Sequence, residues 1–215
     1  MTRTTANEAS RSLGRPGFQL DLGRCVGCGA CVLACRIENG LSAGVSWRRV
    51  LPVNGPRVDG GPTYHLSVAC HHCLNPPCVL ACPTGALEKR SDGIVVLGSD
   101  RCIGCRYCEM ACSFGAPAFD TRTGIMTKCH LCHHRLAEGL DPACVVACPT
   151  EALEYTGTGL ESSAVRATDT PGFGDPAGAE PGFWVVEPGG AARSKWYAKL
   201  KSLLGLNVED SDEPK

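Results

Sequence analysis

The stretch CVGCGACVLAC, residues 25–35, places four cysteines within eleven residues. Four thiolates suit a single metal centre, so the first question is whether Cys35 shares a centre with the other three. Gly27 and Gly29 allow a tight loop whose backbone N–H groups can point inward, and VLAC suits a turn of helix. Cys31 and Cys35 are four positions apart, which places them one helical turn apart on the same face. We therefore expect Cys35 to ligate a second centre, as the fourth cysteine of bacterial iron–sulfur runs does.

The sixteen cysteines of the 215-residue chain fall into four groups of four, and none is left over. The first and third groups have the spacing C-x2-C-x2-C-x3-C, the second C-x2-C-x4-C-x3-C and the fourth C-x2-C-x11-C-x3-C. The groups are Cys25, Cys28, Cys31 and Cys35; Cys70, Cys73, Cys78 and Cys82; Cys102, Cys105, Cys108 and Cys112; and Cys129, Cys132, Cys144 and Cys148.

The groups repeat one another, which indicates a duplicated unit. RCVGCGAC (24–31) matches RCIGCRYC (101–108), and PPCVLACPTGALE (76–88) matches DPACVVACPTEALE (141–154). Fixed self-similarity of this kind marks a repeat. Each repeat has the eight-cysteine pattern of a two-cluster ferredoxin, so we predict an α+β, loop-rich, duplicated two-cluster ferredoxin-like fold with short helices and β-hairpins.

The cysteine spacing favours iron–sulfur clusters over disulfides and zinc. Disulfides belong to oxidising compartments, and MTRTTANEASRSLGRPG lacks the apolar region of a signal peptide. Zinc sites separate two cysteine pairs by a longer loop, whereas clusters use tight triplets with a remote fourth cysteine followed by proline. Pro83 and Pro149 follow the second and fourth groups. We predict four [4Fe-4S] clusters, with a structural zinc-binding module as the alternative.

Composition and motif content indicate the size of the core and exclude several classes of function. Hydrophobic residues make up 43%, yet only three Trp, four Tyr and five Phe are present beside 26 Gly and 15 Pro, so the apolar core should be thin. A net charge of −1 excludes nucleic acid as the main partner. The sequence contains no run of eighteen apolar residues, so we predict no helix that spans a bilayer. We found no phosphate loop, nucleophile elbow or acid–base pair, so we expect no catalytic site and no direct small-molecule substrate.

Two nested units follow from loop closure, because the linker from Cys82 to Cys102 is short and reads as a hairpin. The inner unit, 70–112, would exchange fourth cysteines within itself, and the first and fourth groups would form the outer unit, 18–69 plus 113–155. The predicted ligand sets are cluster 1, Cys25, Cys28, Cys31 and Cys148; cluster 2, Cys129, Cys132, Cys144 and Cys35; cluster 3, Cys70, Cys73, Cys78 and Cys112; and cluster 4, Cys102, Cys105, Cys108 and Cys82.

The rest of the chain is predicted to be strands, hairpins and a tail. FQLDL (18–22), VSWRRVLPV (45–53), TYHLSVA (63–69), FDTRTGIMT (119–127) and GFWVVEP (182–188) have strand or hairpin patterns. We expect residues 1–17 to be a flexible segment and 156–215 a strap with an amphipathic docking helix at 194–206. The helix after the first and third groups is free to continue into Arg36 and Ser113, whereas proline ends it after the other two.

Charged and histidine side chains adjoin the groups. The histidines are expected at the surface or hydrogen-bonded to cluster sulfur, and the cations either solvated or raising a cluster's potential. They are His71, His72, His130, His133 and His134, with Arg24, Arg101, Arg106 and Lys128.

The region 18–155 resembles the iron–sulfur subunit of the dimethyl sulfoxide reductase family of molybdoenzymes. The resemblance is carried by the cysteine groups with VSWRRV, CIGCRYCEMACSFGAP, TGIMTKCHLC and RLAEGLDPACVVACP. It implies a non-catalytic electron-transfer subunit that connects a molybdopterin-containing catalytic subunit, near cluster 1, to an integral membrane quinone-reactive anchor subunit, near cluster 4. Cys105, where nitrate-reductase-like relatives carry Trp, implies a fourth cubane and the dimethyl sulfoxide, polysulfide or sulfite type.

The resemblance also implies a location. With no signal peptide or membrane helix predicted, we expect a cytoplasmic protein held at the membrane by the anchor subunit, with export beside a signal-bearing partner as the alternative. A free polyferredoxin is the other functional alternative. The terminal substrate, the direction of electron flow and the cluster potentials are not encoded in any motif of the chain.

Overall fold

Short elements joined by loops make up the computed structural model, which describes residues 15–53, 64–158, 164–169 and 178–187. The helices are α2 (Ala30–Glu38), α3 (Pro77–Leu80), α4 (Tyr107–Ala111), α5 (His133–Ala137) and α6 (Ala143–Val146). The strands are β1 (Phe18–Asp21), β2 (Arg49–Val53), β3 (Tyr64–Val68), β4 (Leu87–Lys89), β5 (Val95–Leu97), β6 (Ala118–Asp120), β7 (Ile125–Thr127), β8 (Leu153–Tyr155), β9 (Ala164–Arg166) and β10 (Phe183–Val186). No helix among these residues is long and apolar enough to cross a bilayer.

A four-stranded sheet in the order β8-β1-β10-β9 brings together segments from both ends of the described residues. β10 runs parallel to β1, and β8 pairs antiparallel on its other side. Leu20 lies opposite Leu153 on one side and Val185 on the other, and all three side chains are almost completely buried. These three side chains lie at the centre of the sheet and contribute to its apolar core.

Three hairpins carry the other strands: β2–β3, β4–β5 and β6–β7. Each pair is antiparallel and joined by a polar or glycine-containing connection, as the alternation of apolar residues predicted. The strand predictions for FQLDL, VSWRRVLPV, TYHLSVA, FDTRTGIMT and GFWVVEP are confirmed.

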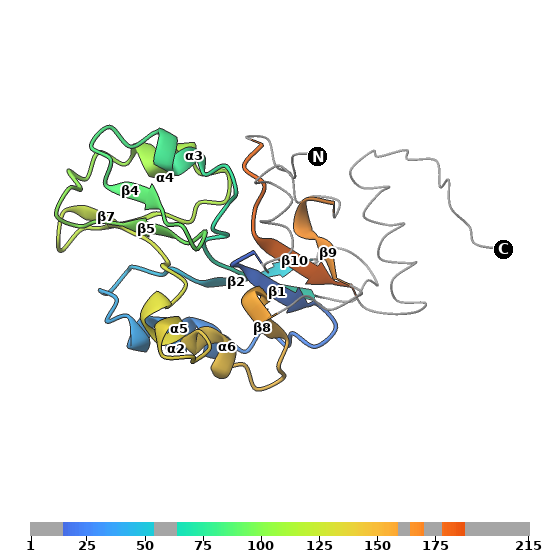
Figure 1. Cartoon of the computed structure of the whole chain (residues 1–215). Coiled ribbons are helices and arrows are strands. Elements are labelled where there is room, and N and C mark those ends of the chain that lie inside the picture. The colour runs from blue at the N-terminus through green and yellow to red at the C-terminus, as the bar shows by residue number, and fades with distance from the viewer. Residues whose placement is uncertain (1–14, 54–63, 159–163, 170–177, 188–215) are drawn as a thin grey trace, which may run out of the picture.

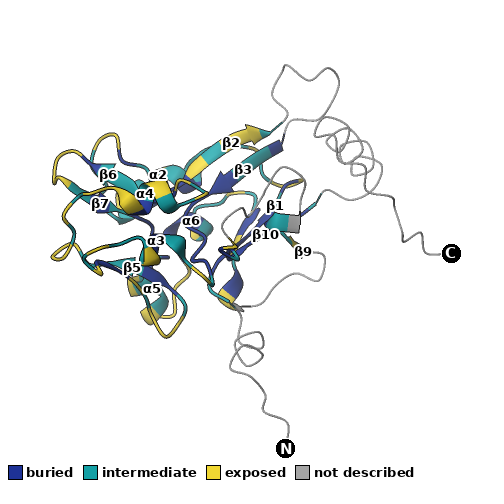
Figure 2. Cartoon of the chain, turned by 90° about the horizontal axis from the view of Figure 1, so that it is seen from above, coloured by how far each residue is buried: buried dark blue, intermediate teal, exposed yellow. Residues whose placement is uncertain are grey.

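Two bodies lie side by side in Figure 1. One contains α3, α4 and the hairpins β4–β5 and β6–β7, and the other contains α2, α5 and α6 with β1 and β8. Within them α2 packs against α6 and α3 against α4, which joins distant cysteine groups. β10 is buried along its length and β1 over its first three residues, whereas exposed residues lie in the loops and on the short helices of both bodies (Figure 2).

The structure departs from the sequence predictions in three places. The β6–β7 hairpin, assigned to the outer unit, packs through Met126 and Phe119 against cysteines of the inner unit. The helix of the first group continues to Glu38, but α4 ends at Ala111 because Cys112 is extended. The helices of the other two groups, α3 and α6, end at Leu80 and Val146, before Pro83 and Pro149.

The third departure concerns the strap predicted from 156. It contains β9 and two 3-10 turns, and Ala167 and Ala179 are fully buried against the sheet. Small apolar side chains at these positions let the backbone approach the sheet closely, which a composition-based prediction cannot detect. Most of the segment 1–17, predicted to be flexible, and all of 194–206, predicted to be an amphipathic helix, lie outside the described residues.

Candidate iron–sulfur centres

Tight loops followed by short helices position the cysteines. Gly27 and Gly29 have φ values of 72° and 76°, and Gly104 and Arg106 take the equivalent places with 69° and 63°. These left-handed residues curl the backbone around the thiols before α2 and α4 begin, as expected for the first cysteines of each run. All sixteen cysteines are free thiols among the described residues, so none is consumed by a disulfide.

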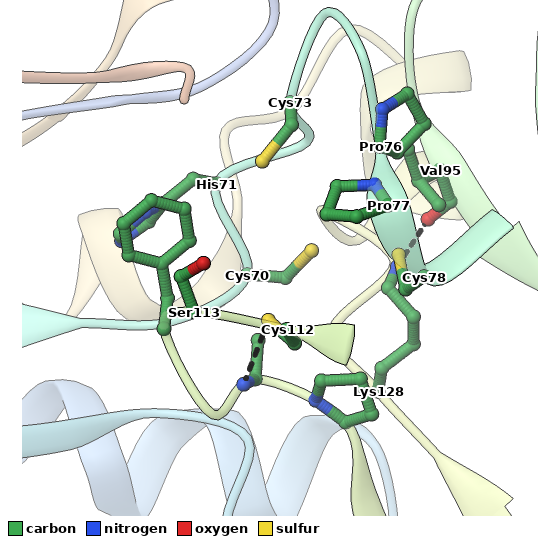
Figure 3. A pocket seen from close by; sticks show the side chains of 13 residues that line it. Cys70, His71, Cys73, Pro76, Pro77, Cys78, Val95, Cys112, Ser113 and Lys128 are labelled. Atoms are coloured by element: carbon green, nitrogen blue, oxygen red, sulfur yellow. Dashed lines mark hydrogen bonds between the residues drawn. The ribbon is translucent and has the colours of Figure 1, made fainter. Parts of the chain in front are cut away.

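The third predicted ligand set surrounds one cavity. Cys70, Cys73, Cys78 and Cys112 all line it, together with Pro76, Pro77, Phe114 and Lys128, and it encloses about 380 Å³ of empty space. Figure 3 shows the four sulfur atoms directed into this common space. Burial, together with the charges of Cys70, Cys112 and Cys78, raises the pKa of the Cys73 thiol to about 12.

The second set surrounds another cavity, of about 250 Å³, lined by Cys35, Cys129, Cys132 and Cys144. Burial raises the pKa of the Cys35 thiol to about 12, and the charges of Cys144 and Cys132 add to the effect. Thiols must lose their protons to become metal ligands. A cationic metal centre between them would favour the thiolate form and lower these raised pKa values.

In the first and fourth predicted sets, charges of other thiols of the same set act on one member. Burial and the charges of Cys31, Cys148 and Cys28 raise the pKa of Cys25. Burial raises the pKa of Cys108 to about 11, with contributions from Cys102 and Cys82. Cys28 and Cys105, the middle cysteines of the two equivalent runs, are the two exposed ones. The assignment of ligands to the first and fourth sets stays a prediction, and Cys105 lies in the loop between Cys102 and Cys108.

Backbone N–H groups are directed at several sulfur atoms. The amides of Ala116, Met126 and Leu131 lie 3.4 Å from the Sγ atoms of Cys112, Cys102 and Cys129 respectively. Burial acts to raise the pKa of Cys82 and Cys148, but hydrogen bonds from the following backbone and threonine hydroxyl lower both. Donors of this kind stabilise thiolate ligands and tune a cluster's potential.

The two bodies meet where cluster sets 2 and 3 adjoin. Burial raises the pKa of Cys129 and the charge of Cys70 is its next cause, so these cysteines of different sets are neighbours. Val95 N donates to His72 Nδ1 at 3.0 Å, which leaves Nε2 to carry the proton, 3.9 Å from Cys129 Sγ. His72 therefore hydrogen-bonds toward a cluster sulfur, one of the two roles expected for the flanking histidines.

Lys128 lies at the same junction. It is buried, and its Nζ donates to the carbonyl oxygens of Cys129, at 2.7 Å, and Val95 (Figure 3). Arg106 and Arg101, by contrast, are exposed and form ion pairs with Glu109 and Glu88. Lys128 thus follows the prediction of a cation near a cluster, and the two arginines follow the prediction of a solvated flank.

Sequence reasoning missed the buried cation Arg48, which is 1% exposed and lines the cavity of the second set. Its position in VSWRRV, 13 residues after Cys35, gives no spacing signal. An arginine within a short strand-like segment of apolar residues is the one hint the sequence contains. Among the described residues, no three His, Cys, Asp or Glu side chains converge tightly enough to hold a single metal ion.

These features fit [4Fe-4S] clusters: two cavities are each lined by four thiols, and backbone N–H groups lie close to several sulfur atoms. Comparison with known protein families agrees. Residues 62–158 match the 4Fe-4S dicluster domain and residues 18–38 the 4Fe-4S binding domain.

Curated relatives carry names of the same kind. A component of the anaerobic dimethyl sulfoxide reductase of Escherichia coli (strain K12) is 46% identical over 147 residues, which cover 65% of this chain and 72% of the relative. The iron–sulfur subunit of a dimethyl sulfoxide reductase from Halobacterium salinarum is 35% identical over 235 residues, covering 92% and 87%. The thiosulfate reductase electron transfer subunit of Salmonella typhi is 43% identical over 136 residues, covering 61% and 70%.

Proposed function

This protein belongs to the family of iron–sulfur subunits of the dimethyl sulfoxide reductases, and on this premise we propose that it conducts electrons between a molybdopterin-containing catalytic subunit and an integral membrane anchor that reacts with quinone. It binds [4Fe-4S] clusters and is an electron-transfer subunit rather than a catalytic one. The proposal adds the number of clusters, their ligands and the identity of both partners. The bound clusters supply one-electron redox chemistry with little change in geometry.

Four clusters with exchanged fourth cysteines account for all sixteen thiols. Two cavities, one lined by Cys70, Cys73, Cys78 and Cys112 and the other by Cys35, Cys129, Cys132 and Cys144, support this ligand map and are the observation that carries the proposal. The sets are Cys25, Cys28, Cys31 and Cys148; Cys129, Cys132, Cys144 and Cys35; Cys70, Cys73, Cys78 and Cys112; and Cys102, Cys105, Cys108 and Cys82.

The same map implies a duplicated fold with a linear order of sites. Residues 31–35 and 144–148 each link the first site to the second, and residues 78–82 and 108–112 each link the third to the fourth. The junction between the second and third sites has no such helix and depends on Cys129, Cys70 and His72. Packing of α2 on α6 and of α3 on α4 supports this arrangement.

Partners would dock at the two ends of this order. Exposed Cys28 is flanked in sequence by exposed Val26 and Leu33, and exposed Cys105 by Ile103 and Met110. Clusters of exposed apolar side chains mark protein-binding surfaces. By the family resemblance, the catalytic subunit covers the Cys28 end and the membrane anchor the Cys105 end, which would hold the protein at the membrane.

Metal analysis tests the cluster count. Anaerobically purified protein should contain about sixteen iron atoms and as much acid-labile sulfide per chain. About four zinc atoms in a colourless, folded protein would instead support the structural zinc-binding module.

Partner assignment is tested by matched substitutions in the assembled complex. Met110→Asp should release the membrane anchor while retaining the catalytic subunit, because a charge in an apolar interface is costly. Leu33→Asp should do the reverse. Purification of the protein alone, with both variants behaving like the original, would favour a free polyferredoxin.

A further inference from the structure

A cation is buried between the first and second sites. Arg48 is 1% exposed, and its guanidinium carbon lies 4.2 Å from the centroid of the Phe18 ring. The charges that act on it most strongly come from the thiols of Cys144, Cys129, Cys31 and Cys35. Burying a guanidinium is expensive unless opposite charge compensates it, and thiolates that hold an anionic cluster would provide that charge.

One arm of Arg48 reaches a ligand of the first site through a serine. Nη1 donates to the carbonyl oxygen of Ser67 at 3.2 Å and to its Oγ at 3.0 Å. The Oγ of Ser67 lies 3.3 Å from Cys31 Sγ. Because a thiolate ligand can only accept, the hydroxyl proton of Ser67 must point at Cys31 when the site is loaded.

The other arm faces the second site. Nη2 is buried without another hydrogen-bond partner, and Arg48 lines the cavity formed by Cys35, Cys129, Cys132 and Cys144. Burial raises the pKa of Cys144, whereas the charge of Arg48 acts to lower it. A buried donor with no protein oxygen to satisfy it marks the place of an anionic group.

We propose that Arg48 is a positioning residue that raises the reduction potentials of clusters 1 and 2 together, through Ser67 to Cys31 and directly toward Cys144. The inference rests on the proposed ligand map. Each reduction adds negative charge beside a fixed cation in a water-poor site, where Coulomb interactions are strong, so the reduced form is favoured. Exposed Arg101 and Arg106 at the opposite end are screened by solvent and cannot act comparably.

The experiment is a redox titration of the purified complex, monitored by electron paramagnetic resonance, with signals assigned from single cysteine variants. Arg48→Met should make reduction of clusters 1 and 2 at least about tenfold less favourable, a shift of about 59 mV for a one-electron couple. Arg48→Lys keeps the positive charge, so the potentials of clusters 1 and 2 should stay close to those of the unmodified protein. Ser67→Ala should shift cluster 1 alone by a few-fold.

Arg122→Met is the matched control, since it removes one positive charge from an exposed side chain and should leave all potentials unchanged. Unchanged potentials in Arg48→Met, or an equal shift of all four clusters, would overturn the inference while leaving the proposed function intact. If Arg48→Met does not assemble, Ser67→Ala decides: an unaltered cluster 1 potential overturns the inference. Absence of iron from the unmodified protein would instead overturn the proposed function.

Discussion

The two bodies of the molecule share a cysteine pattern but have hydrophobic cores of different size. The sheet body, defined as β8, β1, β10 and β9 with α2, α5 and α6, belongs to a large core that includes Phe18, Leu20 and Phe183. The hairpin body, defined as α3, α4, β4–β5 and β6–β7, has a core of five buried residues, two of which are Cys78 and Cys108. Apolar burial can hold the first body without metal, whereas the second lacks the area to do so.

Equivalent loop positions differ too. Gly27 and Gly104 occupy the same place in the two repeats, but a side chain at the first would meet the His65 ring, and at the second the backbone carbonyl of Gly124. Gly29 starts α2, whereas Arg106 starts α4 in the same left-handed conformation. Duplication therefore preserved the thiols and backbone shape while the surroundings of each loop diverged.

Removing iron should have the largest effect on stability, and it should affect the two bodies differently. We expect the hairpin body to open first under anaerobic chelation, because its core is small and two of its five buried residues are predicted ligands that would lose their metal. Limited proteolysis should cut between residues 70 and 128 while β1, β8 and β10 stay protected. Simultaneous cleavage of both bodies would contradict the comparison.

Core truncations should act on one body each. Leu20 and Met126 are almost completely buried, in the sheet and hairpin bodies respectively. Leu20→Ala and Met126→Ala should each cost about 2–5 kcal/mol through lost burial and a residual cavity. Hydrogen exchange should rise in β1, β8 and β10 for the first variant and in β4–β7 for the second. The same pattern for both would show that the cores are one.

Alanine at the equivalent loop glycines should be unequally harmful. Gly104→Ala places a Cβ directly against the carbonyl oxygen of Gly124, which is backbone and cannot rotate away. Gly27→Ala meets the side chain of His65, which can move. Both variants also incur about 1–2 kcal/mol for a left-handed residue with a side chain. Iron retention on heating should be lower for Gly104→Ala, and equal retention would argue against the backbone clash.

The smallest effect is expected at the helix starts. Nothing lies within 4 Å of a Cβ at Gly29, so Gly29→Ala tests conformation alone and should cost about 1–2 kcal/mol. That change would lower the melting temperature by a few degrees, at about 2–4 °C per kcal/mol. Arg106→Gly should move it in the opposite direction, because it relieves the same strain. A fall for Arg106→Gly would show that its ion pair with Glu109 outweighs the backbone strain.

The sequence determined the repeat, the cofactor class and the family, because cluster ligation demands thiols at short, fixed spacings that leave a direct trace in the order of residues. Strands such as β1 and β10 could also be predicted from their apolar residues. Cys35 illustrates the limit of what is local: its helical offset from Cys31 predicts a second centre, but its neighbours Cys132 and Cys144 lie about a hundred positions away.

Tertiary structure alone decided what surrounds each site. Burial of Arg48 between two thiol sets, the packing of β6–β7 against the inner cysteines and the parallel pairing of β10 with β1 all join residues with no common periodicity. Ligand spacing is a short-range constraint, so it can be predicted from the sequence. Electrostatic environment and packing are sums over neighbours contributed by distant segments, so they exist only once the protein has folded.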